Sequence, residues 1–279
     1  MQISQHLPRL RHQLGRKLQL GNRAYRVRGY IGNRQAVGLA HEAHLIPVIR
    51  TALAKREGTF VDVGVNTGQT LLKVLSIDPQ RGYLGFEPQV ACCACLGQFL
   101  HDNDLGHFRI LPIALSDRDG FEWLQARDGY DEMASTSTKS FERAIPVPVR
   151  TGDSVLGELG VNAPAVIKID VEGSELDVLR GLEATLAQAR PVVIFEVLPN
   201  FTGPDRTPIA HAQAEQNSLR AALIWDLFFE LGYRVSQISG TGECSEINAF
   251  DLDDREEFVG RDFVAWPESF ADLRGADHN

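Results

Sequence analysis

The stretch DVGVNTGQT at residues 62–70 decides the fold of this chain. It begins inside a short apolar run that starts at Thr59, and an amphipathic stretch follows it as far as Ile77. This order predicts a buried strand, a glycine-rich turn and a helix. Gly64 and Gly68 allow unusual backbone angles and the close approach of a ligand, and free N–H groups at the helix start attract a negative group. We therefore expect a carboxylate or a phosphate to bind at this turn.

Outward from the turn, short apolar runs alternate with helical patterns along most of the chain. We expect strands at residues 59–63, 82–86, 108–115, 165–169, 191–195, 233–238 and 262–266, and helices at 45–53, 67–77, 90–100, 174–188 and 217–231. The central strands are apolar on both faces, which is typical of a mostly parallel sheet covered by helices on both sides. The fold class is therefore α/β, and such sheets bind ligands beyond the carboxyl ends of their strands.

Glu87 stands at the end of the second expected strand. A carboxylate there can accept hydrogen bonds from both hydroxyls of a ribose, which indicates an adenosine-containing cofactor with a negative group. NAD and S-adenosylmethionine both meet this description. The G-x-G-x-x-G fingerprint of dinucleotide sites is missing, and the side chain of Asn66 would hinder a pyrophosphate, so the smaller amino-acid tail of S-adenosylmethionine is favoured. The alternative for Glu87 is a surface acid before a proline.

A third polar stretch, KIDVEGSE at residues 168–175, ends the fourth strand and begins a helix. Lys168 and Asp170 lie on one face of that strand, and Glu172 follows at the edge where ligands bind. Ionisable groups beside a buried strand are costly unless they are paired or functional. One interpretation is a catalytic cluster, and the other is a capped helix with a local ion pair.

Five stretches in order make the sequence resemble the FkbM-type family of S-adenosylmethionine-dependent methyltransferases. They are FVDVGVNTGQT (60–70), FEP (86–88), ALSD (114–117), IKIDVEGSELDVLRGL (167–182) and VIFEV (193–197), and they cover about residues 59–200. Val65 stands where the family usually has Ala. The resemblance implies the class I methyltransferase fold, a Rossmann-like sheet of seven strands, and methylation of an oxygen. The acceptors of the family are often sugar hydroxyls in glycolipids or natural products.

The resemblance also assigns roles to the residues at matching positions. Together with the glycine turn, it gives a cofactor-binding set: Asp62, Gly64, Asn66, Thr67, Gly68, Glu87, Ser116 and Asp117. The turn would hold the methionine part of S-adenosylmethionine, Glu87 the ribose, and the pair Ser116–Asp117 the adenine.

The catalytic set is Asp170, Glu172 and Lys168, which the resemblance places where the methyl group and the acceptor meet. A sugar hydroxyl is a poor nucleophile, so a nearby base should take its proton. Asp170 is the first candidate and Glu172 the second, while Lys168 would hold the carboxylate or act as the base itself. Glu196, after the fifth strand, would line the acceptor site. Acidic clusters can also hold Mg²⁺, but no metal-ligand spacing supports this, so we expect no metal.

The chain is asymmetric in charge. Residues 1–56 carry eleven Lys or Arg and one acid, although the whole chain has a net charge of −9. We divide it into a basic, helical N-terminal arm at 1–57, packed on the core, and a methyltransferase domain at 58–279. Such an arm favours an anionic partner or a peripheral membrane contact, and the alternative is that it neutralises its own acidic domain.

The remaining expectations concern location and partners. No apolar run approaches the ~20 residues that cross a bilayer, and the N-terminus lacks the apolar stretch of a secretory signal, so we expect a cytoplasmic protein. The expected partner is a small-molecule or glycan acceptor and not nucleic acid, since no aromatic–basic signature of RNA binding accompanies the arm.

Two other functions stay open: a nicotinamide-dependent oxidoreductase, and a non-catalytic binding module that uses the arm. A cofactor-binding assay would separate the first from a methyltransferase.

Overall fold

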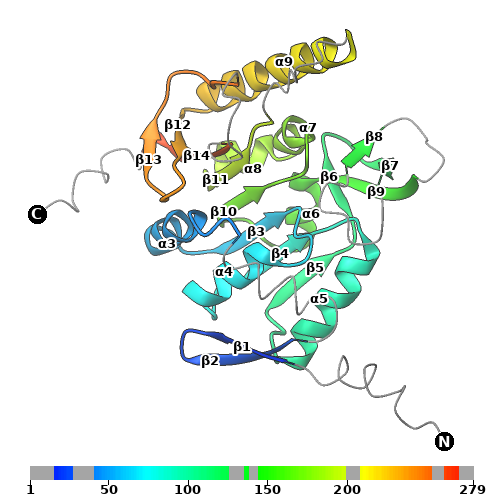
Figure 1. Ribbon diagram of the computed structural model, residues 1–279, viewed down its shortest axis with the longest axis vertical. Coiled ribbons are helices and arrows are strands. Elements are labelled where there is room, and N and C mark those ends of the chain that lie inside the picture. The colour runs from blue at the N-terminus through cyan, green and yellow to red at the C-terminus, as the bar shows by residue number, and fades with distance from the viewer. Residues whose placement is uncertain are drawn as a thin grey trace, which may run out of the picture.

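The computed structural model describes residues 16–27, 41–125, 135–137, 144–198, 208–252 and 261–269. Within them, the centre of the molecule is an eight-stranded sheet (Figure 1). From edge to edge the strands are β13 (Cys244–Glu246), β12 (Tyr233–Ile238), β14 (Asp262–Pro267), β11 (Val192–Glu196), β10 (Pro164–Ile169), β3 (Thr59–Val63), β4 (Tyr83–Phe86) and β5 (Phe108–Leu111). The strand before the glycine turn, β3, therefore lies inside the sheet between β10 and β4.

Two layers of helices cover the sheet because its strands send alternate side chains to opposite faces. One layer consists of α3 (Leu45–Lys55), α4 (Gln69–Ile77) and α5 (Val90–Asp102), and the other of α6 (Gly152–Glu158), α7 (Glu175–Arg180), α8 (Glu183–Gln188) and α9 (Pro208–Glu230). Phe60 packs with the first layer and its neighbour Val61 with the second. The predicted α/β class is confirmed. Among the described residues, no helix combines the length and the apolar character needed to cross a membrane.

The sheet is mixed, and it has one strand more than the seven that the resemblance implied. Strands β11, β10, β3, β4 and β5 run parallel to one another. β14 runs antiparallel between β11 and β12, and β13 pairs antiparallel with the other side of β12. All three residues of β13 are exposed, so no apolar pattern marks this strand in the sequence.

The strand predicted at 108–115 is in fact two strands in different sheets. β5 ends at Leu111, and β6 (Ala114–Ser116) joins a four-stranded sheet with β7 (Gly120–Gln125), β8 (Ser135–Ser137) and β9 (Ile145–Thr151). Pro112 lies at the break and has no N–H with which to continue a ladder. The break turns Leu115 toward the cavity that is described below.

The helix predicted at 174–188 is also two elements, α7 and α8, with a break at Gly181. Gly181 packs so closely on β6 that an added Cβ would lie 2.0 Å from the carbonyl oxygen of Ser116. The carboxylate of Asp153, on α6, then accepts hydrogen bonds from two backbone N–H groups in the first turn of α8. Contacts from other elements therefore divide a segment that is helical by its local pattern.

Part of the predicted helical arm is a β-hairpin. Strands β1 (Arg16–Leu20) and β2 (Arg23–Val27) pair antiparallel, and their buried side chains join the cluster under α3. Asn103, after α5, fastens the hairpin by accepting a hydrogen bond from the N–H of Arg26 at 2.6 Å and donating one to its carbonyl oxygen at 2.8 Å. Residues 1–15 and 28–40 of the arm lie outside the described residues, and the domain boundary at residue 57 stays a prediction.

Candidate active site

A cavity of about 520 Å³ lies at the carboxyl ends of β3, β4, β10 and β11. Seven residues predicted for the site line it: Gly64, Asn66, Glu87, Lys168, Asp170, Glu172 and Glu196. Parallel strands bring their carboxyl ends to one edge of a sheet, so residues that are far apart in the sequence face one space. The volume falls in the range of small-molecule sites, roughly 300–1,000 Å³.

The turn after β3 requires glycine at its first position. Gly64 has a φ of +89°, and an added Cβ would lie 1.8 Å from the carbonyl oxygen of Asp170. The N–H of Asp170 in turn donates to the carbonyl oxygen of Val63 at 2.9 Å. The turn and the end of β10 are therefore in direct contact. Asn66 has a φ of +49°, a conformation that is costly for a residue other than glycine and is concentrated at ligand sites.

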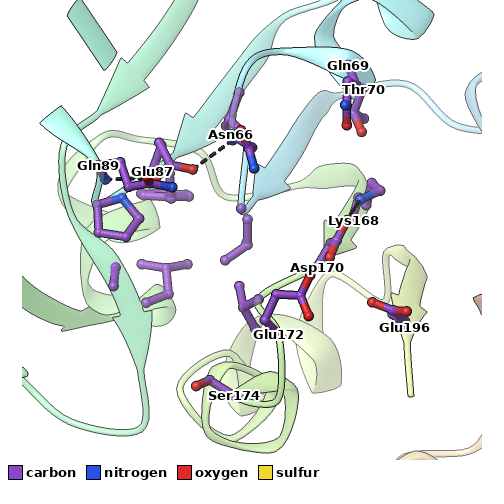
Figure 2. Close-up of a pocket in the computed structure, with 18 of the residues that line it drawn as sticks. Asn66, Gln69, Thr70, Glu87, Gln89, Lys168, Asp170, Glu172, Ser174 and Glu196 are labelled. Carbon is purple, nitrogen blue, oxygen red and sulfur yellow. Dashed lines mark hydrogen bonds and ion pairs between the residues drawn. The ribbon is translucent and has the colours of Figure 1, made fainter. Parts of the chain in front are cut away.

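Glu87 is buried at the end of β4 and lines the cavity. One carboxylate oxygen accepts a hydrogen bond from the N–H of Asn66 at 2.7 Å, and the other accepts one from the N–H of Gln89 at 2.8 Å (Figure 2). Burial raises the pKa of Glu87 to about 7, although both N–H groups act in the opposite direction. Because an ionised carboxylate has about four acceptor sites, two remain for a pair of ligand hydroxyls.

An apolar group of lining residues comes from β4, the segments after it and the small sheet: Phe86, Pro88, Ala114, Leu115 and Leu124. Ser116 and Asp117, predicted to contact the adenine, are absent from the lining that the described residues form. The hydroxyl of Ser116 lies 3.3 Å from Glu122, and Asp117 pairs with Arg118 at 2.8 Å. Neighbours of the predicted pair therefore supply the apolar surface that a flat base needs.

Three residues predicted to bind the cofactor are absent from the lining: Asp62 in β3, and Thr67 and Gly68 in the turn after it. Asp62 is fully buried and accepts a hydrogen bond from the hydroxyl of Tyr83. Burial raises the pKa of Asp62 to about 6. Gly68 has a φ of +89°, and its carbonyl oxygen accepts a backbone hydrogen bond from the first turn of α4. Asp62 and Gly68 therefore shape the turn without facing the ligand space.

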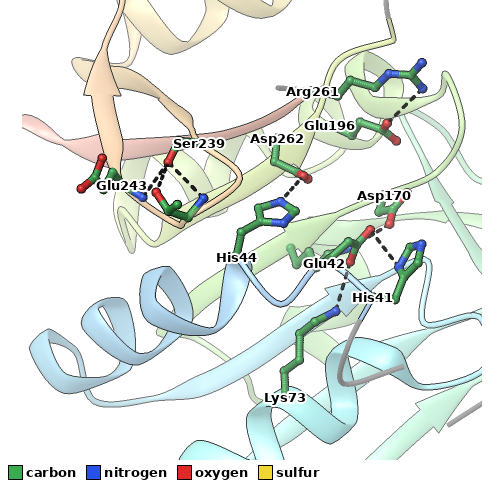
Figure 3. Close-up of polar contacts among 12 residues, drawn as sticks. His41, Glu42, His44, Lys73, Asp170, Glu196, Ser239, Glu243, Arg261 and Asp262 are labelled. Carbon is green, nitrogen blue, oxygen red and sulfur yellow. Dashed lines mark hydrogen bonds and ion pairs between the residues drawn. The ribbon is translucent and has the colours of Figure 1, made fainter. Parts of the chain in front are cut away.

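A network of buried charges forms another wall of the cavity (Figure 3). Lys168 lies 2.8 Å from Asp170, and Lys73 of α4 lies 3.1 Å from Glu42, which precedes α3. Burial would lower the pKa of Lys168, but the charges of Asp170, Glu42 and Asp62 outweigh it and raise that pKa above its usual value. Burial would raise the pKa of Glu42, but Lys168 and Lys73 bring it to about 2. The 2.8 Å pair with Asp170 favours the charged form of Lys168, which argues against Lys168 as the base and for a role in holding Asp170.

Three carboxylates gather beside this network, on Asp170, Glu172 and Glu196. Each offers an oxygen within 4.8 Å of the other two. Burial, and then the charges of Asp170 and Glu172, raise the pKa of Glu196 to about 8, while Arg261 lies 3.8 Å from it. Such a group can accept hydrogen bonds from several hydroxyls or bind a cation. The expectation that the site uses no metal stays a prediction.

Five titratable lining residues have no counterpart in the predicted set: His41, Glu42, His44, Arg261 and Asp262. His44 Nε2 lies 2.7 Å from Asp262 Oδ2 (Figure 3). Because β14 runs antiparallel to β11, its first residue reaches the edge where β11 ends, so an acid at the start of the last strand was an available signal. The turn before α3 carries no comparable signal, since only tertiary packing brings it to the cavity.

These residues fit an adenosine cofactor with an amino-acid tail. Oδ1 of Asn66 is buried and has no hydrogen-bond partner among the described residues, so it is left to accept one from a ligand. The missing Cβ of Gly64 lets the end of β10 pack against the turn, and Gly64 also lines the cavity. Glu87 suits the two hydroxyls of a ribose, and the apolar group suits a base.

An α/β sheet with such a glycine turn and such a carboxylate is typical of proteins that bind a nucleoside-containing cofactor. Residues 62–235 match the family model of the Methyltransferase FkbM domain, and the chain belongs to this family. The family indicated by the five stretches is therefore confirmed, and this membership argues against a nicotinamide-dependent oxidoreductase.

Individual relatives are more distant. The 2-O-methyltransferase NoeI of Sinorhizobium fredii is 26% identical over 158 residues, which are 51% of this chain and 64% of that protein. The structure of methyltransferase FkbM from Methylobacillus flagellatus overlaps with a TM-score of 0.48 at 15% identity, covering 75% of this chain and 44% of that one. The plantazolicin methyltransferase BpumL in complex with SAH overlaps with a TM-score of 0.42 at 10% identity, covering 85% and 87%. The chain thus spans less than two thirds of the first two relatives.

Proposed function

We propose that this protein transfers a methyl group from S-adenosylmethionine to a hydroxyl of a sugar, a glycolipid or a natural product. The observation that carries the proposal is the buried Glu87 carboxylate, held by two backbone N–H groups beside the Gly64 turn. Membership of the FkbM family supports methyl transfer. The name of the relative NoeI, a 2-O-methyltransferase, supports oxygen as the acceptor atom.

In this proposal the lining divides into a cofactor part and an acceptor part. Gly64, Asn66 and Glu87 hold the cofactor, and the apolar group around Leu115 receives its base. S-adenosylmethionine supplies an electrophilic methyl group on a positively charged sulfur. Alignment of the acceptor with that group is the contribution of the protein, because orientation alone lowers the barrier substantially.

The acceptor part of the lining is polar and rich in hydrogen-bond acceptors. Asp170, Glu172 and Glu196 can each accept a hydrogen bond from an acceptor hydroxyl. Lys168 fixes the position of Asp170 through the 2.8 Å ion pair. A dense set of carboxylates suits an acceptor with several hydroxyls, and it opposes an acceptor that carries a phosphate near the reacting oxygen.

Calorimetry tests the cofactor. Wild-type protein should bind S-adenosylmethionine and its demethylated product, and it should bind NAD little or not at all. Glu87→Gln should weaken binding of the product by about 2–3 kcal/mol, the loss expected for hydrogen bonds to a charged group. Glu175→Gln is the matched control, because Glu175 is also a buried carboxyl that accepts a backbone hydrogen bond, but it lies outside the lining. Preferential binding of NAD would overturn the proposal.

A transfer assay tests the acceptor. S-adenosylmethionine labelled in the methyl group is incubated with a panel of methyl glycosides of common hexoses and deoxyhexoses, and NMR locates the label. The proposal expects a new methyl ether on a ring hydroxyl. Methylation of nitrogen or carbon in competing acceptors, with none on oxygen, would contradict it. A non-catalytic binding module would give neither cofactor binding nor transfer.

A further inference from the structure

An acceptor hydroxyl must lose its proton, and two of the residues predicted for this task, Lys168 and Asp170, are paired with each other at 2.8 Å. Lys168 is almost fully buried. If Asp170 took a proton, the charge of Lys168 would lose its nearest partner inside the protein. Glu196, with a pKa of about 8, is largely protonated at neutral pH and then donates a hydrogen bond instead of accepting a proton.

His44 is a further candidate for accepting this proton. It precedes α3, lines the cavity and keeps 17% of its side chain exposed, as does its partner Asp262. The 2.7 Å contact joins His44 Nε2 to a carboxylate oxygen, which can only accept a hydrogen bond when ionised. Nε2 must then carry the hydrogen, and in the neutral ring the lone pair lies on Nδ1. A histidine whose tautomer and ring orientation are fixed by a carboxylate is a recurrent form of general base.

We propose that His44 accepts the proton of the acceptor hydroxyl and that Asp262 positions its ring; the inference rests on the proposed function. The two residues come from opposite ends of the chain, and β14 brings them together at the edge of the sheet (Figure 3). His44 is thus the catalytic residue and Asp262 a positioning residue.

The step balances as follows in atoms and charge. The hydroxyl oxygen of the acceptor bonds to the methyl carbon while the carbon–sulfur bond breaks, and sulfur keeps that electron pair. The hydroxyl proton moves to Nδ1 of His44, which becomes a cation beside the ionised Asp262. The proton then leaves to the solvent, and the products are a methyl ether, a neutral thioether and one proton.

Asp262 lies beside the cation that this step creates, 2.7 Å from Nε2 of His44. The other described titratable groups in the same cavity are the acids Glu42, Glu87, Asp170, Glu172 and Glu196, and the bases His41, Lys168 and Arg261. The turn between β12 and β13 packs on the backbone of His44 at Gly242, and it carries Glu243. Lys168 is paired directly with Asp170 at 2.8 Å, and Arg261 lies 3.8 Å from Glu196.

The first test uses NMR and needs no acceptor. Wild-type protein labelled with ¹⁵N-histidine and saturated with S-adenosylhomocysteine is titrated from pH 5.5 to pH 9. We expect His44 to be the neutral Nε2–H tautomer at high pH and to gain one proton at Nδ1 on acidification. Asp262→Asn should abolish the fixed tautomer. A His44 ring that stays in the Nδ1–H form, or that never titrates in this range, overturns the inference.

The second test uses single-turnover transfer to the methyl glycoside that reacts in the panel. His44→Gln should lower the rate roughly 10²–10⁴-fold and remove the fall in rate at acidic pH, while the affinity for S-adenosylhomocysteine changes less than twofold. The acidic fall in the wild type should coincide with the protonation of His44 seen by NMR. His101→Asn, an exposed histidine at the end of α5, is the matched control and should leave rate and profile unchanged.

Two outcomes contradict the assignment. In the first, the fall in rate at acidic pH survives in His44→Gln and disappears in Glu196→Gln or Asp170→Asn. The carboxylate whose removal abolishes the fall would then be the general base. Imidazole could fail to restore activity to a folded His44→Gly variant, since a general base of this kind can be replaced from solution. The proposed function fails separately, through absence of cofactor binding in the wild-type protein, and the NMR result stands without any acceptor.

Discussion

Glu87 holds its proton to an unusually high pH, and this couples cofactor binding to pH. Burial raises the pKa of Glu87 to about 7, and hydroxyls that donate to its carboxylate would lower that pKa in the complex. Affinity for S-adenosylhomocysteine should therefore rise between pH 6 and pH 8. Below the pKa that Glu87 has in the ligand-free protein, the change should be at most about tenfold per pH unit. Calorimetry in two buffers of different ionisation enthalpy should show proton release near pH 6.5. Glu87→Gln should bind more weakly with no such dependence, and an unchanged dependence in that variant would exclude this cause.

Gly64 is the residue on which the turn depends. An alanine there would need a φ of +89° and would place its Cβ 1.8 Å from a backbone oxygen. We expect Gly64→Ala to lower the free energy of unfolding by more than about 2 kcal/mol and to abolish cofactor binding, because the two loops must separate. Gly106→Ala is the control, since nothing lies within 4 Å of its added Cβ and its φ is ordinary. Equal stability of the two variants by urea unfolding would contradict the close contact.

At this scale, the sequence identified residues whose position follows from strand order. Gly64, Glu87 and Asp170 end adjacent parallel strands, and such ends must converge on one edge. His44 could not be found in this way, because the turn before α3 reaches the cavity only through packing. Ser116 was placed by family position, yet Pro112 redirects the chain before it and leaves its hydroxyl beneath the lining.

At the scale of elements, the Glu42–Lys73 pair joins the turn before α3 to helix α4. The side chain of Lys73 is 0% exposed, so removal of its partner would leave a buried charge poorly compensated. Glu42→Gln should lower the free energy of unfolding by about 3–5 kcal/mol. The double variant Glu42→Gln with Lys73→Met should recover most of that loss, as measured by chemical denaturation. Additive losses in the double variant would show that the two charges are not coupled.

The local sequence pattern predicted most helices and strands, but it was wrong where contacts with other elements interrupt a helix or a strand. The segment at 174–188 is helical by pattern, and its break at Gly181 exists because β6 passes within contact. The hairpin of β1 and β2 did carry a local signal, since Leu18 and Leu20 alternate with polar residues before a Gly21–Asn22 turn.

For the whole molecule, four carboxyls with raised pKa values, three buried and one partly buried, make stability depend on pH. Burial raises the pKa of Asp62 to about 6, of Glu87 and Glu175 to about 7, and of Glu196 to about 8. Unfolded carboxyls lose their protons near pH 4, so between about pH 5 and pH 8 the folded state binds more protons than the unfolded state. The free energy of unfolding should therefore fall as pH rises through this range.

Each fully protonated group contributes a slope of about 1.4 kcal/mol per pH unit below its folded pKa. Glu42 acts in the opposite direction, but its contribution changes only below about pH 4.5, outside this window. Thermal melts of the ligand-free protein should give a higher Tm at pH 6 than at pH 8. Glu175→Gln should flatten the slope. A Tm that rises from pH 6 to pH 8 would mean that these carboxyls ionise normally.

The residues that line the cavity fall into two groups, those inside the segment that matches the family model and those outside it. Every cofactor-holding residue lies within the matched span 62–235, whereas His41, Glu42, His44, Arg261 and Asp262 lie on its two flanks. In the proposed function, the acceptor part of the lining therefore combines Asp170, Glu172 and Glu196 from the matched span with residues from both flanks. A chimera that exchanges one flank alone would separate His44 from Asp262, whereas one that exchanges both flanks would keep the pair together.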